Sequence, residues 1–120
     1  MSKIIIIITL ILYSKSLVAM DFLECIKDIP VHNKIIEIQD SCFIFDSETG
    51  KIVSVEAQYS SSNSEVLDFY KNILKQFGWV LKSEKLDEAL IFIRDNEILK
   101  ININNFNIIL FNSFLSINNN

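Results

Sequence analysis

An amphipathic helix between residues 64 and 77 is the sequence feature that most limits how this chain can fold. Its apolar side chains recur at the 3.6-residue period of one helix face, at Val66, Phe69, Tyr70, Ile73, Leu74 and Phe77. Ser62 and Glu65 have the spacing of a capping box and predict where the helix begins. Gly78 directly after the last periodic residue predicts a left-handed C-terminal cap. A helix with one apolar stripe must bury that stripe against another element.

The segments on both sides of this helix have the alternation of half-buried strands. Two strands are expected before the helix, the first of them bent, at residues 34–45 and 53–60. Four strands are expected after it, at residues 79–83, 89–94, 99–103 and 107–115. We therefore expect an α+β fold in the order β-β-α-β-β-β-β, with the single helix packed on one face of an antiparallel sheet.

A second, short helix is expected over residues 21–29, ahead of the first strand. Asp21 is a suitable N-cap, and Pro30 would end the helix. The apolar side chains along one side are Phe22, Cys25, Ile26 and Ile29. We expect this segment to dock on the larger domain.

Residues 1–19 are interpreted as a secretory signal peptide. Lys3 provides the charged start, residues 4–13 the apolar stretch, and Ala19 the last residue before cleavage. Ten apolar residues are fewer than the roughly 20 that a membrane-spanning helix needs, and an uncleaved anchor is the alternative. The prediction is a periplasmic or secreted protein with no stable transmembrane span after cleavage, and one domain over residues 20–120.

The charge balance excludes one class of partner. The 120-residue chain has 15 acids and 11 basic residues, and loss of residues 1–19 would remove Lys3 and Lys15 but no acid. The mature chain of 101 residues would then carry a net charge of about −6. Nucleic-acid binding depends on clustered Lys and Arg, so we expect no nucleic-acid partner.

Two cysteines, Cys25 and Cys42, remain in the mature chain. An oxidising compartment would allow them to pair, and closing a loop of this size stabilises a domain by about 3 kcal/mol in the chain-entropy model. The alternative is two separately buried thiols that behave as small apolar side chains. Both alternatives stay open, because the sequence does not place the two Cα atoms within bonding reach.

Few residues carry the chemistry of a catalytic or metal site. His32 is the only histidine, and Asp28 or Asp40 would be its acidic partner in a small hydrolase or hydrolase accessory. Zinc sites need clustered Cys and His, and phosphate loops need several glycines, whereas the chain has only Gly50 and Gly78. We therefore expect no metal, no cofactor and no catalytic residues.

The helix region resembles a family of small, uncharacterised exported proteins of alphaproteobacteria. The shared pattern includes Glu65-Val66, Phe69-Tyr70, Leu74 and Gly78-Trp79, and the likeness extends to residues 28–30 and 50–53. A composition rich in Ile, Asn and Lys is similar to that of a rickettsial member. The resemblance implies an exported α+β domain and carries no known activity or site residues.

These observations favour a non-enzymatic periplasmic or envelope-associated module that binds another envelope protein or a component of the cell envelope. The hydrolase using His32 is one alternative. A secreted inhibitor or effector that acts on a host target is another.

Overall fold

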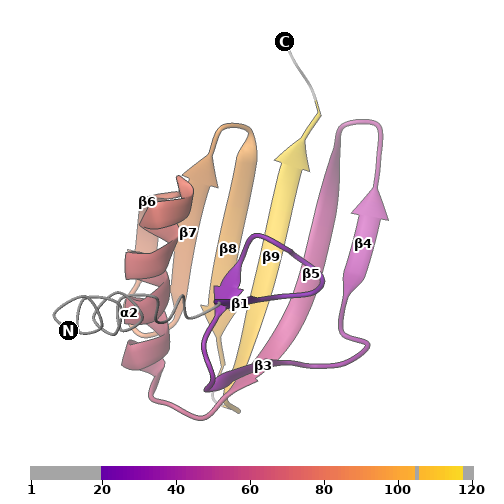
Figure 1. The fold of residues 1–120 in the computed structure, drawn as a ribbon. Coiled ribbons are helices and arrows are strands. Elements are labelled where there is room, and N and C mark those ends of the chain that lie inside the picture. Colours follow the sequence, from indigo (N-terminus) through magenta and orange to yellow (C-terminus); the bar gives the residue numbers. More distant parts are fainter. Residues whose placement is uncertain (1–19, 105, 118–120) are drawn as a thin grey trace, which may run out of the picture.

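The computed structural model describes residues 20–104 and 106–117, so the expected signal peptide lies outside the described residues. These residues contain one α-helix, α2 (Asn63–Ile73), which continues into the 3₁₀ turn η1 (Leu74–Phe77) and packs against an antiparallel sheet (Figure 1). The expected α+β class, with one helix against an antiparallel sheet, is confirmed. Within the described part of the chain, no helix is both long enough and apolar enough to cross a membrane.

The main sheet has seven strands, all paired antiparallel. They are β3 (Ile35–Glu37), β4 (Phe43–Asp46), β5 (Gly50–Tyr59), β6 (Val80–Lys85), β7 (Ala89–Arg94), β8 (Glu97–Ile103) and β9 (Ile108–Ser116). Their spatial order is β3-β5-β9-β8-β7-β6, and β4 pairs with β5 on the same edge as β3.

Three strands of the main sheet precede the helix where two were expected, because the bent first strand is interrupted. Asp40, between β3 and β4, has a φ of 64°, a left-handed conformation that breaks an extended strand. Ser41 Oγ accepts a hydrogen bond from the Glu56 backbone N–H across this gap, at 3.1 Å. β3 and β4 therefore line one edge of the long strand β5, one after the other.

The ends of the helix are where the sequence placed them. Ser62 is the N-cap, and its Oγ accepts a hydrogen bond from the Glu65 N–H at 3.2 Å. Gly78 has a φ of 86° and closes the last turn through hydrogen bonds from its N–H to the carbonyls of Leu74 and Lys75. Since residues other than glycine rarely adopt this backbone conformation, Gly78 fixes the point where the chain leaves the helix for β6.

The core lies between the sheet and a layer made of α2 and the N-terminal segment, residues 20–33 (Figure 1). Tyr70 of the helix is fully buried, its ring meets Phe111 of β9 edge to face at 5.5 Å, and its hydroxyl donates to the Pro30 carbonyl at 2.9 Å. Burial raises the pKa of Tyr70, so the hydroxyl keeps its proton and remains a donor. Tyr70 thus joins the helix, the sheet and the N-terminal segment.

The prediction of a short helix over residues 21–29 is wrong. The segment forms two short strands, β1 (Asp21–Phe22) and β2 (Pro30–Val31), which pair with each other and are joined by turns. Nine residues are too few for a helix that is stable by itself. Tertiary contacts decide the conformation of residues 21–29 instead, because the buried side chains Leu23, Ile26 and Ile29 belong to the main core.

Candidate functional site

Cys25 and Cys42 form a disulfide that ties the N-terminal segment to the start of β4. The two sulfur atoms are 2.09 Å apart and the Cα atoms 5.7 Å apart, which lies in the usual range for a disulfide. Of the two alternatives that the sequence left open, the structure has the paired one. The expected site pair is therefore brought together, although its residues are 17 positions apart.

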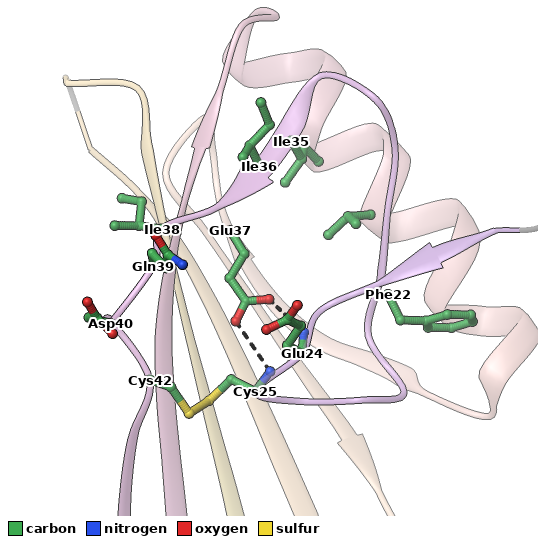
Figure 2. Close-up of a pocket in the computed structure, with 11 residues that line it drawn as sticks. Phe22, Glu24, Cys25, Ile35, Ile36, Glu37, Ile38, Gln39, Asp40 and Cys42 are labelled. Atoms are coloured by element: carbon green, nitrogen blue, oxygen red, sulfur yellow. Dashed lines mark hydrogen bonds between the residues drawn. A yellow bond between two sulfur atoms is a disulfide. The ribbon is translucent and has the colours of Figure 1, made fainter.

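A hollow of about 990 Å³ opens beside this disulfide, between the N-terminal segment and β3 with its following loop (Figure 2). The Glu37 carboxylate points across it and accepts hydrogen bonds from the N–H groups of Glu24, at 2.6 Å, and Cys25, at 3.3 Å. These bonds satisfy backbone amides in the turns after β1. Glu37 and the disulfide therefore hold the two walls of the hollow together.

The lining of this hollow is acidic and apolar. Its described lining contains three carboxylates, of Glu24, Glu37 and Asp40, together with apolar side chains, and no His, Lys, Arg or Ser. Both cysteines in the lining are bonded to each other, so neither offers a thiolate nucleophile. Among the residues that the structure describes, no group of three or more His, Cys, Asp or Glu side chains is placed to hold a metal ion.

His32 has other contacts than the acids that the hydrolase alternative assigns to it. Its Nδ1 accepts a hydrogen bond from the Lys34 N–H at 3.0 Å, and its ring packs edge to face on Phe69 with centroids 4.6 Å apart. Desolvation by burial, and then the charge of Lys34, lowers the pKa of His32. The described contacts of His32 thus include neither Asp28 nor Asp40, and Asp40 instead lines the hollow.

Asp28 belongs to a cluster around Arg94, the only arginine of the chain. The Arg94 guanidinium binds the Asp28 carboxylate, contacts that of Glu97 at 3.1 Å and donates to the Phe77 carbonyl at 3.0 Å. Its charged carbon lies 4.1 Å from the centroid of the Trp79 ring, a cation–π arrangement. This cluster connects the N-terminal segment to the end of the helix and to the β7–β8 hairpin, so we assign it a role in the stability of the fold.

The face of the sheet turned away from the helix, here called the open face, carries an exposed apolar row. Strand register aligns one apolar residue from each of six adjacent strands, and this apolar row consists of Phe45, Ile52, Phe114, Ile98, Ile93 and Val80. All but Ile93 are counted among the exposed large hydrophobic residues, and Val80 is the most exposed, at 61%. The exposed area is on the order of several hundred Å², comparable to the largest apolar patch of a typical monomeric protein, which is often functional.

The rest of the open face is more polar. One step along the strands, the neighbours of the row include Ser54, Asn112 and Lys100, and the Ser54 hydroxyl donates to Asn112 Oδ1 at 2.7 Å. The polar character continues at Glu56 and Asn102 on the same face. The apolar row is therefore bordered on this side by hydrogen-bonding groups, an arrangement common in protein interfaces.

Gly50 allows the row to lie flat where β5 meets β9. A Cβ at this position would lie 3.1 Å from the Phe114 ring and 2.6 Å from the Leu115 carbonyl oxygen. Any other residue would push Phe114 away from Ile52, its neighbour in the row. The apolar row was not predicted from the sequence. Its only sequence signal is an apolar residue in each strand at a position where the alternation predicts a polar one.

Comparison with known proteins adds no family to this description. No protein-family model, no curated protein and no solved structure matches the chain. The resemblance of the helix region to exported alphaproteobacterial proteins therefore stays a prediction.

Proposed function

We propose that this protein is a non-enzymatic, exported binding module whose open face docks on another protein of the cell envelope. The observation that carries the proposal is the apolar row, which crosses six strands and stays exposed while the other face of the same sheet is covered. When a partner covers a connected apolar area of this size, the apolar surface leaves water and the free energy of the complex is lowered.

The shape of the open face favours a protein surface as the ligand over a small molecule. Small-molecule sites are concave and enclose most of the ligand, whereas the apolar row follows the pleat of a sheet. Ser54, Asn112, Lys100 and Glu56 border the row on one side, and such a rim provides hydrogen bonds and charges that select the partner.

Two features support export. The Cys25–Cys42 disulfide is of a kind that forms and persists in oxidising compartments such as the periplasm. Residues 1–19 have the composition of a secretory signal peptide. A partner in the cell envelope fits this location, because the two proteins would meet after export.

Site-specific photo-crosslinking tests this function. A benzophenone side chain placed at Ile98 or Val80, in the row, should give an adduct of the same mass in a native envelope fraction. The same probe at Asn72 or Gln76, exposed on the helix side, is the matched control and should give none. Ile52→Lys, in the row but away from the probes, should remove the adduct while leaving the circular dichroism spectrum unchanged.

The proposal fails if the open-face probes give no adduct, or if the helix-side probes give the same adduct in equal yield. It also fails if Ile52→Lys leaves the adduct unchanged in a folded protein.

A further inference from the structure

The two edge strands of the main sheet, β6 and β4, differ in charge and regularity, and only β4 is suited to pair with another chain. β6 forms one edge, and it carries Lys82, Glu84 and Lys85 together with a register shift between Leu81 and Ser83. Charges and bulges of this kind prevent an edge strand from pairing with another chain. β4, on the opposite edge, has no register shift and only one charged residue, Asp46 at its end. Its other side chains, Phe43, Ile44 and Phe45, are 60%, 52% and 52% exposed.

The outer edge of β4 is free within the described residues, since β4 pairs only with β5 there. The N–H of Ser47 donates to the Gly50 carbonyl at 2.8 Å, which makes residues 47 and 50 a hydrogen-bonded pair. Because such pairs alternate along an antiparallel ladder, Phe45 and Phe43 direct their backbone groups to β5. Ile44 therefore directs its N–H and its carbonyl outward.

We propose that β4 pairs with β4 of a second copy of this chain, in antiparallel register about a twofold axis at Ile44. Phe43-Ile44-Phe45 reads the same in both directions, so this register places each Phe43 opposite Phe45 of the second copy and Ile44 opposite Ile44. The two aromatic pairs lie on the open face, where cross-strand aromatic pairs stabilise a sheet. The outward N–H and carbonyl of each Ile44 bond to those of the other.

The neighbouring registers are less favourable. A twofold axis at Phe43 places Ile44 opposite Cys42 and Phe45 opposite Ser41 of the second copy, so only one aromatic pair forms, against two with the axis at Ile44. An axis at Phe45 places Ile44 opposite Asp46 of the second copy, so an apolar and a charged side chain face each other. The axis at Ile44 instead places Asp46 opposite Cys42, whose sulfur is already bonded to Cys25.

The size of this interface sets the kind of dimer that it forms. Aromatic side chains bury about 150 to 250 Å² each, so covering the exposed parts of three side chains removes on the order of 300 Å² per copy. Stable complexes bury about 800 Å² per partner. The dimer is therefore weak and in rapid, concentration-dependent equilibrium with the monomer.

A twofold axis through an edge pair is perpendicular to the sheet, so the open faces of both copies lie on the same side. The two apolar rows then lie within one continuous sheet, and the dimer presents twice the docking surface of a monomer. The dimer and the proposed docking share Phe45 but do not depend on each other, because the hydrogen bonds that form the dimer lie at Ile44, which is outside the apolar row.

Disulfide trapping tests the register. Hydrogen-bonded antiparallel pairs have Cα atoms about 5.5 Å apart, within the range for a disulfide. The disulfide-bonded protein with Ile44→Cys should form a covalent dimer on mild oxidation, visible on a non-reducing gel. Val80→Cys is the matched control, because Val80 is at least as exposed as Ile44 but lies on the protected edge, and this variant should cross-link at least tenfold more slowly. Equal rates for the two variants would overturn the proposal.

Sedimentation velocity tests the dimer without new cysteines. The unaltered protein should shift from monomer to dimer as its concentration rises. Ile44→Pro should stay monomeric, because it removes the outward N–H and leaves the bonds of Phe43 and Phe45 to β5 in place. Ile44→Lys, with two like charges at the axis, should also stay monomeric, whereas Val80→Lys should dimerise as the unaltered protein does.

A protein that stays monomeric up to millimolar concentration, or that forms a ladder of larger species instead of a dimer, contradicts the proposal. Both tests are independent of the envelope partner. Photo-crosslinking from Ile98 should continue in Ile44→Lys, so failure of the dimer and failure of the docking function give different results.

Discussion

Arg94 shows how one side chain can connect parts of the chain that are far apart in sequence. It binds Asp28 in the N-terminal segment, the Phe77 carbonyl at the end of the helix and Glu97 across the β7–β8 hairpin. The planar guanidinium makes these contacts while it stacks on Trp79, a combination that the compact ammonium group of lysine cannot reproduce. The contacts of residue 94 therefore depend on the planar shape of the guanidinium as well as on its charge.

The first prediction concerns Arg94→Lys, which keeps the positive charge and removes the planar guanidinium with its several N–H donors. We expect the free energy of unfolding to fall by about 1 to 2 kcal/mol, because hydrogen bonds to three partners and the stacking on Trp79 are weakened together. Urea unfolding followed by tryptophan fluorescence measures this change. Asp28→Asn, which affects only one partner, is the comparison and should cost less. An Arg94→Lys variant as stable as the unaltered protein would refute the assigned role.

At the scale of elements, the sequence predicted best where the determinants are local. The helix stripe, the Ser62 cap and the Gly78 end depend on residues within a few positions of one another, and all three are confirmed. The N-terminal segment has a similar apolar spacing but forms strands and turns. Its conformation is decided by Glu37, by the partner cysteine and by the core, which lie outside the local pattern.

The disulfide gives the second prediction. It closes a loop between residues 17 positions apart, so its reduction should lower the free energy of unfolding by about 3 kcal/mol in the chain-entropy model. Urea unfolding with and without a thiol reductant measures the difference. The double variant Cys25→Ser and Cys42→Ser is the control, and its stability should be low and unaffected by reductant. Equal stability of the oxidised and reduced proteins would show that the link does not support the fold.

The whole molecule has two unequal sheet faces, and only one of them was accessible from the sequence. The helix-facing residues alternate within each strand, so their pattern can be read strand by strand. The apolar row depends on which strands are neighbours: Ile52 and Phe114 meet because β5 pairs with β9 across most of the domain. That pairing is long-range, and no local pattern determines its register. The candidate docking surface therefore became visible only with the sheet assembled.

The third prediction follows from the strand order. β9 lies between β5 and β8 and is bonded on both sides, whereas β6 is an outermost strand. Native-state hydrogen exchange should therefore be slowest in β9, because its amides exchange only through the largest opening of the domain. Outward amides of β6 should exchange orders of magnitude faster. Equal protection of β6 and β9, read by mass spectrometry or NMR, would contradict this ranking.

The bend between β3 and β4 has a consequence for survival among proteases. Gln39 and Asp40 are exposed, and loops of this kind are preferred sites of cleavage. A cut between them falls inside the loop that Cys25 and Cys42 close. Both fragments would stay covalently joined, with β3 and β4 still paired to β5. The molecule can thus be cut at this exposed bend and keep its parts together.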